Sequence, residues 1–272
     1  MMNYRLIFAL TSMLFMLAGC QTVQTTGGGA VGVERQQRMM ISSAQINAAA
    51  EQSYAQTLRE AQGKGVLNRD PNQVNRVRAV ASRLIPATAA FRSDAPGWRW
   101  EVNVISSQEI NAWCMPGGKI AVYTGLMDAL QLNDAELAAV MGHEIAHALR
   151  EHGREKASQQ AAQNAVIGIG AAVLGVGQGG AELANMAAQV TYGLPNSREF
   201  EREADRIGVE LAARAGYDPR AAISLWQKMA QATGGRGGPA FLSTHPQAAD
   251  RITDLQKYAA QVMPIYQSTQ RR

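Results

Sequence analysis

Residues 140–153 read "VMGHEIAHALREHG" and carry three of the four histidines of this 272-residue chain. Two of them, His143 and His147, are four residues apart, and Glu144 directly follows the first. In an α-helix, residues i and i+4 project from one face, so both imidazoles can reach a single tetrahedral Zn²⁺ ion. Glu144 then lies beside the ion as a candidate general base. This H-E-x-x-H spacing predicts a catalytic zinc site.

The residues before the motif predict where its helix begins. Asn133 and Glu136 have the spacing of an N-terminal capping box, which satisfies backbone N–H groups at a helix start. No helix-breaking residue follows until about Gly153. We therefore expect one unbroken helix with the motif near its middle and with the histidines away from the main apolar stripe.

A catalytic zinc ion needs a third protein ligand and one open position. The metzincin arrangement would place a histidine at position 153, where this chain has Gly153. His152 is one place away, and on an unbroken helix it projects about 180° from His143. We interpret His152 as a surface histidine and look for the third ligand elsewhere.

A second predicted helix, which follows Ser197 as its N-cap, supplies an oxygen ligand. Glu201 and Asp205 are i, i+4 neighbours beside its apolar stripe. Glu201 is the predicted third ligand, and Asp205 is the predicted hydrogen-bond acceptor that orients a ligand histidine. We assign Glu199 and Glu203 to the solvated face of the same helix.

The rest of the sequence predicts a small sheet and a mainly helical body. Alternating apolar residues predict a strand at 98–104, and the stretch 119–124 after the break at 116–118 predicts a second, in a sheet of two to four strands. An Ala- and Gln-rich composition without Pro or Gly predicts a helix over 34–62, and helical spacing predicts one over 72–86. A capping box predicts a helical turn at 106–109. The fold class is therefore α+β and predominantly helical.

The N-terminal residues 1–19 have the layout of a secretory signal: one cation, an apolar run of about a dozen residues, then small residues. The stretch Leu17–Cys20 resembles a bacterial lipobox, which predicts lipidation of Cys20. An ordinary signal peptide with a chance cysteine is the alternative. Gln21 stands where an inner-membrane retention signal would have Asp. We expect a lipid-anchored protein on the periplasmic side of the bacterial envelope, at the outer membrane.

Composition sets the domain organisation and excludes some partners. Residues 20–33 are polar and Gly-rich, which predicts a flexible tether, and 34–272 then form a single domain. The apolar segment 165–177 is too short to span a bilayer, so we expect a hairpin beside the site, with membrane contact as the alternative. No run of Lys and Arg with interleaved aromatic residues exists, so nucleic acid is excluded as a partner. Cys114 has no cysteine to pair with once Cys20 is lipidated.

Four segments in this order resemble metallopeptidase family forty-eight, the gluzincins that include the CAAX prenyl protease and the membrane protease HtpX. They are 111–126, Gly142–His147, Ser197–Asp205 and 243–252. The resemblance implies a zincin-like core, a small sheet beside the active-site helix, and one Zn²⁺ per chain. The lipobox resembles the periplasmic lipoprotein branch, similar to the assembly protease BepA but without a tetratricopeptide-like tail. That branch implies protein quality control and contact with envelope assembly machinery.

The expected substrates are unfolded or extended protein segments. The strand at 119–124 would be an open sheet edge that pairs with such a segment through backbone hydrogen bonds. His245 is a helix-flanking residue before Pro246, an oxyanion donor, or a fourth zinc ligand that makes the enzyme latent. Arg251 either pairs with a site carboxylate or is solvated.

Two classes of function follow from these features. The first is a zinc metalloendopeptidase of the envelope that cleaves unfolded or misassembled proteins, with Glu144 as general base. The second is an envelope chaperone or assembly factor with a latent or structural zinc site. An intact Glu144 favours the enzyme, because a structural site needs no base. Another zinc hydrolase on the same scaffold is a weaker third possibility.

Overall fold

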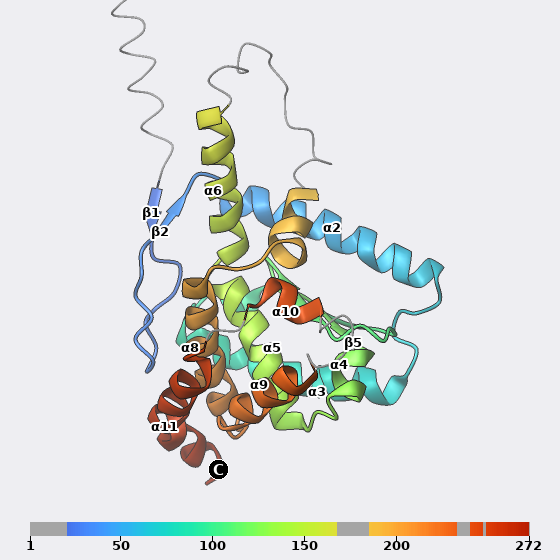
Figure 1. The fold of residues 1–272 in the computed structure, drawn as a ribbon, viewed down its shortest axis with the longest axis vertical. Coiled ribbons are helices and arrows are strands. Elements are labelled where there is room, and N and C mark those ends of the chain that lie inside the picture. Colours follow the sequence, from blue (N-terminus) through green and yellow to red (C-terminus); the bar gives the residue numbers. More distant parts are fainter. Residues whose placement is uncertain (1–20, 168–184, 233–239, 247–248, 272) are drawn as a thin grey trace, which may run out of the picture.

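The computed structural model describes residues 21–167, 185–232, 240–246 and 249–271 (Figure 1). The predicted signal peptide and Cys20 lie outside these residues, as does most of the apolar segment 165–177. Within the described ranges, no helix is both long enough and apolar enough to cross a bilayer.

A three-stranded sheet stands beside the motif helix. Its strands are β3 (Glu101–Ile105), β4 (Ala112–Met115) and β5 (Lys119–Tyr123), in the order β3-β5-β4. Strand β5 is parallel to β3 and antiparallel to β4. The prediction that 119–124 is an open edge was wrong, because β5 is the central strand. The edge on the side of the motif helix is β4.

Two glycines form the turn that connects β4 to β5. Gly117 and Gly118 have φ angles of 79° and 83°, a region that L side chains rarely adopt. They form the tight turn that folds β4 back onto β5. A Cβ atom on Gly118 would also lie 2.6 Å from the Trp100 ring. The sequence showed the turn but not the four-residue strand before it.

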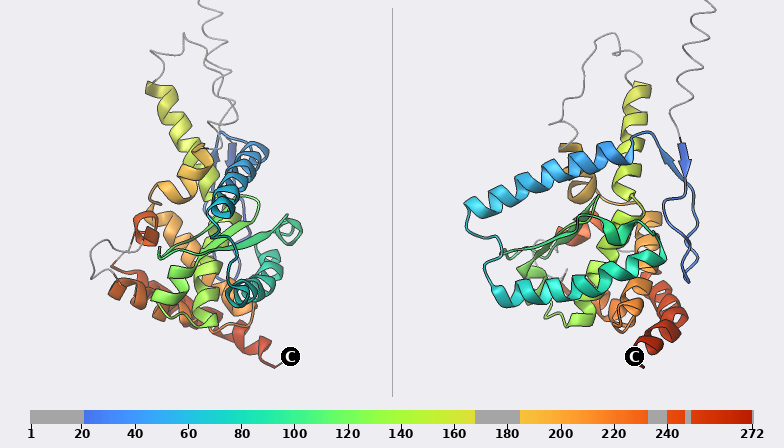
Figure 2. Two further views of the ribbon diagram at one scale, coloured as in Figure 1. Left: turned by 90° about the vertical axis from the view of Figure 1, so that its right-hand side faces the viewer. Right: turned by 180° about the vertical axis from the view of Figure 1, so that it is seen from behind.

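Helices cover both faces of the sheet (Figure 2). Helix α2 (Ser43–Gly63) packs on one face through Ile46, Ala50 and Tyr54, among others. Helix α3 (Pro71–Ala87) and helix α5 (Asp134–Leu149) lie on the other face. The predicted helix over 72–86 is confirmed, whereas the one over 34–62 begins only at Ser43. Its N-cap Ser42 forms a capping box with Gln45.

The centre of the molecule is the crossing of α5 and α8 (Arg198–Arg214). The predicted capping box of Asn133 and Glu136 at the start of α5 is confirmed. The helices cross at two glycines: a Cβ atom on Gly142 would lie 2.9 Å from the Gly208 carbonyl oxygen, and one on Gly208 would lie 2.8 Å from the His143 nitrogen. Because neither glycine has a side chain, the two helices approach closely, and the carboxylates of α8 come within reach of the histidines of α5.

The remaining elements surround this crossing. They are α4 (Thr124–Ala129), α6 (His152–Ile167), η5 (Gln189–Gly193), α9 (Ala221–Ala232), α10 (Ala240–Thr244) and α11 (Arg251–Thr269), with short 3₁₀ turns η2 (Thr88–Ala90) and η3 (Ala95–Gly97). The helical turn predicted at 106–109 is absent. There the Ser107 hydroxyl accepts a hydrogen bond from the Glu109 N–H instead.

The motif helix ends earlier than the sequence predicts. Helix α5 stops at Leu149, and Glu151 has a φ of 50° before α6 begins at His152. The Glu151 carboxylate accepts hydrogen bonds from Arg92 at 2.6 Å and from Arg154 at 2.7 Å. These contacts hold a left-handed conformation that is unfavourable for glutamate. The expectation of an unbroken helix to Gly153 was wrong, and the turn redirects His152.

Residues 21–41, which we call the N-terminal arm, differ from the predicted tether. Strand β1 (Gln21–Val23) pairs with β2 (Gln37–Met39). Val31 and Val33 are buried in the main core. The Arg35 guanidinium donates to Glu155 at 2.7 Å and to Glu203 at 2.6 Å. Because Val31 and Val33 are buried and two buried carboxylates bind Arg35, the Gly-rich stretch that we predicted to be a flexible tether packs against the rest of the domain.

Candidate metal centre

Four buried side chains from three parts of the chain meet beside the α5–α8 crossing. His143 and His147 come from α5, Glu201 comes from the first turn of α8, and His245 directly follows α10. One potential ligand atom from each lies within 4.8 Å of all the others. The structure thus brings together the two motif histidines, the predicted third ligand, and the histidine whose role the sequence left open.

The spacing of these atoms suits a tetrahedral metal ion. The Nε2 atoms of His143 and His147 are 3.1 Å apart, and they lie 3.5 and 3.3 Å from oxygens of Glu201. Ligands at about 2.0–2.1 Å from a tetrahedral zinc ion are separated by about 3.3 Å. Imidazole nitrogen and carboxylate oxygen are also the donors that zinc accepts.

Glu144 lies next to the cluster without ligating it. Its Oε1 atom is buried, has no hydrogen bond among the described residues, and lies 3.4 Å from His245 Nε2. A buried oxygen without a hydrogen bond is costly, which is consistent with a site that takes up a further polar group. Burial also raises the pKa of the Glu144 carboxyl.

The electrostatics of the cluster favour a positive charge. Although burial opposes it, hydrogen bonds to Asp205 and Glu201 raise the pKa of His143 to about 9. Burial holds the pKa of His147 well below its usual value. Burial opposes ionisation of Glu201, yet the nearby His245 and the hydrogen-bonded histidines keep its pKa well below the usual range. A field that stabilises an imidazolium also suits a metal cation.

Asp205 contacts His143 on the side away from the cluster. Its Oδ1 lies 3.0 Å from His143 Nδ1. Because a carboxylate only accepts hydrogen bonds, the imidazole donates through Nδ1–H to Asp205, and Nε2 is the nitrogen directed into the cluster. This is the contact that the sequence suggested for Asp205.

The structure places His152 and Glu203 differently from the sequence prediction, which put both in solvent. Both are buried. His152 Nδ1 lies 2.8 Å from His147 Nδ1, and its Nε2 lies 2.9 Å from Glu203 Oε2. The glutamate, also bound by Arg35 and Arg150, has a pKa below its usual range despite its burial. Glu199 does lie in solvent, with its side chain 63% exposed.

His245 and Asn196 complete the wall of the cluster. The Nδ1 atom of His245 is 3.0 Å from Glu201 Oε1 and 3.1 Å from His143 Nε2. Its ring stacks on Phe241, with centroids 4.2 Å apart. The amide of Asn196, which sequence reasoning missed, donates to Glu201 Oε1 at 2.9 Å. No sequence pattern predicts this role for Asn196, because Asn196 precedes α8 and its partner Glu201 lies within that helix.

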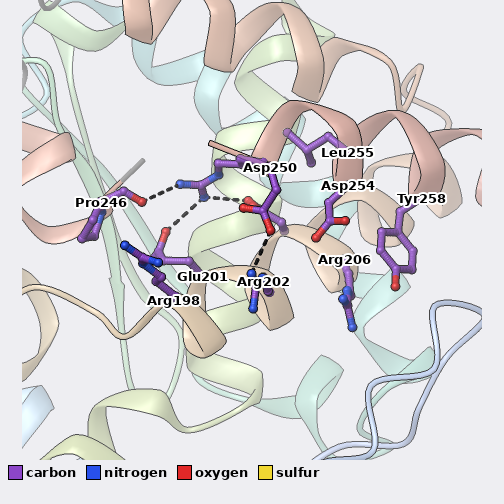
Figure 3. Close-up of a pocket in the computed structure, with 11 residues that line it drawn as sticks. Arg198, Glu201, Arg202, Arg206, Pro246, Asp250, Asp254, Leu255 and Tyr258 are labelled. Carbon is purple, nitrogen blue, oxygen red and sulfur yellow. Dashed lines mark hydrogen bonds and ion pairs between the residues drawn. The ribbon is translucent and has the colours of Figure 1, made fainter. Parts of the chain in front are cut away.

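Arg251 is buried and paired, which resolves the alternatives that the sequence left open for it. Its guanidinium donates to Glu201 Oε2 at 3.0 Å and to Asp205 Oδ1 at 2.7 Å. It therefore ties the two carboxylates of α8 together. Glu201 and this arginine also line a pocket between α8 and α11, where Arg202 pairs with Asp250 (Figure 3).

A second pocket opens on the other side of the cluster. It lies between β4, α5 and η5. Glu144, His147 and His245 line it, together with Cys114 of β4 and Val190 of η5. Cys114 is buried, as expected for a small apolar residue. The predicted general base, His147 and His245 thus face a space beside a sheet edge.

Comparison with known proteins connects this geometry to a family. The sequence model of peptidase family M48 matches residues 71–259, more than half of the chain. Mitochondrial metalloendopeptidase OMA1 of Schizosaccharomyces pombe is 37% identical over 161 residues, which cover 59% of this chain and 47% of the relative.

Two further relatives match longer parts of the chain. Mitochondrial metalloendopeptidase OMA1 of Bos taurus is 29% identical over 95% of this chain and 49% of its own length. The beta-barrel assembly-enhancing protease of Escherichia coli strain K12 is 28% identical over 76% of this chain and 43% of its own length. The chain thus spans about half the length of these relatives.

Proposed function

The chain belongs to peptidase family M48, and from this membership and the geometry of its site we propose that it is a zinc-dependent metalloendopeptidase. The observation that carries the proposal is the buried cluster of His143, His147 and Glu201, whose donor atoms have the spacing of a tetrahedral site. Glu144, an acid that is not needed to bind a metal, lines a pocket together with His147.

Each residue of the site has one role in this proposal. The two histidines, through Nε2, and the Glu201 carboxylate would hold one zinc ion, while Asp205 and Arg251 orient His143 and Glu201. A zinc ion bound there supplies Lewis-acid polarisation of carbonyl and water oxygens. Glu144 accepts a proton from the attacking water and passes it to the leaving amine.

The edge strand β4 is the proposed binding site for substrate. Among the described residues, β4 pairs with β5 on one side alone, and its Cys114 lines the pocket that contains Glu144. An extended peptide can add to such an edge through backbone hydrogen bonds. Because a backbone contact of this kind requires an unfolded segment but little side-chain specificity, we propose unfolded or misassembled proteins as substrates.

Removal of the metal should abolish this activity. The purified protein is expected to cleave unfolded casein, to lose cleavage when a chelator extracts the zinc, and to regain it when stoichiometric zinc is restored. Fragment release on gels, measured beside the zinc content, checks this expectation. Cleavage that continues at full rate in zinc-free protein would contradict the proposal.

We also propose that the protein is a lipoprotein of the bacterial envelope with a role in protein quality control. The predicted lipobox ending at Cys20 supports the anchor. The name of the beta-barrel assembly-enhancing protease supports contact with envelope assembly machinery. Substitution of Cys20 by Ser should move the protein from the outer-membrane fraction to the soluble periplasmic fraction. An unchanged membrane fraction would contradict the lipid anchor.

A latent site is a second candidate, because His245 lies inside the cluster. Its Nδ1 lies 3.1 Å from His143 Nε2, which is also the distance between His147 Nε2 and His143 Nε2. A fourth protein ligand would fill the position that a catalytic zinc ion keeps open. The protein would then act as a chaperone or assembly factor until the loop after α10 moves.

The variant His245→Ala distinguishes these states. In a latent site it should retain one zinc ion per chain and cleave casein several-fold faster, because the open position is no longer blocked. Slower cleavage with zinc retained would instead make His245 an oxyanion donor. Unchanged cleavage and unchanged zinc coordination would exclude both roles.

A further inference from the structure

A line of hydrogen bonds extends from His147 away from the metal cluster. His147 Nδ1 lies 2.8 Å from His152 Nδ1, and His152 Nε2 lies 2.9 Å from Glu203 Oε2. All three side chains are buried. His152 is not among the four residues that converge on the cluster, so its contact with His147 needs a separate explanation.

The carboxylate at the end of the line has two cationic partners. Glu203 accepts from Arg150 at 2.8 Å and from Arg35 at 2.6 Å. Arg150 is completely buried and also donates to the Arg35 carbonyl oxygen at 2.9 Å. Two guanidinium groups, which remain charged in proteins, therefore keep the glutamate as an acceptor.

Because Glu203 is a hydrogen-bond acceptor, it determines which ring nitrogens of His152 and His147 carry a proton. Because Glu203 accepts, His152 donates through Nε2–H, and its Nδ1 carries a lone pair if the ring is neutral. His147 must then donate through Nδ1–H to that lone pair, since two unprotonated nitrogens at 2.8 Å would repel. The remaining nitrogen of His147, Nε2, is left with its lone pair directed at the cluster.

We propose that His152 and Glu203 are positioning residues that hold His147 in the tautomer and ring orientation required to bind a metal ion. The proposal rests on the proposed function, because it assumes that His147 Nε2 is a ligand. The two ligand histidines are then oriented by different routes. His143 has a direct carboxylate partner in Asp205, whereas His147 reaches a carboxylate through a second imidazole.

We call the hydrogen-bonded line of His147, His152 and Glu203 the relay. It depends on the break after α5 and on the N-terminal arm. The left-handed residue Glu151 turns His152 back toward His147. Arg35 of the arm covers Glu203 from outside, and it also binds Glu155 of α6 at 2.7 Å. Figure 1 shows the arm alongside α6 and α8. The arm is therefore part of the support of His147.

The zinc affinity of three variants tests the relay. In His152→Phe the ring can still stack on Phe200, whose ring lies 4.4 Å away, but it cannot accept from His147. In His152→Asn the amide oxygen can replace Nδ1 as acceptor. Phe200→Leu is the matched control, because it alters packing on the same ring without removing a hydrogen bond.

We expect zinc to bind about 10–100-fold more weakly to His152→Phe, as found for other residues that support metal ligands. The affinity of His152→Asn should lie between those of His152→Phe and the parent, and Phe200→Leu should match the parent. Competition with a chromophoric chelator measures these constants. Parental affinity in a folded His152→Phe would overturn the relay, whereas a parent that binds no zinc would overturn the proposed function and the relay with it.

Histidine tautomers in the metal-free parent test the same idea without a variant. In ¹⁵N-labelled protein, long-range ¹H–¹⁵N spectra should show His147 protonated at Nδ1 and His152 protonated at Nε2. His147 protonated at Nε2 alone would overturn the proposal. This result does not depend on whether any substitution disturbs the fold.

Discussion

The variant Glu144→Gln is expected to lose casein cleavage by on the order of 10²–10⁴-fold, the contribution of a general base, while it retains one zinc ion per chain. Gln has the shape of Glu but cannot accept the proton of the attacking water. Zinc should stay because Glu144 is not one of the four residues whose donor atoms converge. A gel assay beside metal analysis measures both quantities.

Glu136→Gln is the matched control for this variant. Glu136 is a buried glutamate on the same helix, and its carboxylate caps the N-terminus and pairs with Lys228. Glutamine can also complete a capping box, so the control should fold and cleave casein. A Glu144→Gln protein as active as this control would remove Glu144 from the mechanism. Loss of zinc from Glu144→Gln would mean that Glu144 helps to bind the metal.

Replacement of Glu201 by Gln is expected to remove most of the bound zinc and, with it, the activity. The amide is neutral and is a weaker zinc ligand than a carboxylate. We expect a loss of affinity larger than the roughly 10–100-fold found for residues that only support a ligand. Arg251 keeps its contact with Asp205, so the buried guanidinium still has one anionic partner.

Glu199→Gln is the control for this second variant, because Glu199 is on the same helix and its side chain is 63% exposed. It should bind zinc and cleave casein like the parent. Equilibrium dialysis measures the zinc affinity of Glu201→Gln and of Glu199→Gln. Equal zinc affinities for the two variants would contradict the assignment of Glu201 as a ligand.

The parts of the site that lie on regular helices could be predicted from sequence. Helical spacing places His143 and His147 on one face, and the same spacing places Glu201 and Asp205 on another helix. Capping residues then fix where these helices begin, as Asn133 and Ser197 do. Local rules of this kind require no knowledge of distant parts of the chain.

The parts that depend on distant contacts were missed. Glu151 carries no sequence sign of a left-handed conformation, because Arg92 and Arg154 stabilise it in the folded state. Without that turn, His152 and Glu203 were assigned to solvent. The N-terminal arm resembles a tether in composition, but Arg35 binds carboxylates more than 100 residues away.

The edge of the sheet shows a related limit. Strand β4 has four residues that are all buried, so its sequence lacks the alternation that predicted β3. A short strand buried on both faces cannot be recognised by periodicity alone. The error moved the predicted substrate edge from β4 to β5, although both flank the same turn.

Anomalous X-ray scattering from a crystal of the purified protein, recorded on both sides of the zinc absorption edge, tests the central claim most directly. We predict one anomalous peak per chain, at about 2.0–2.2 Å from Nε2 of His143, Nε2 of His147 and a carboxylate oxygen of Glu201. A zinc-containing crystal with its peak elsewhere, or with none at this cluster, would contradict the account of this protein as a zinc peptidase.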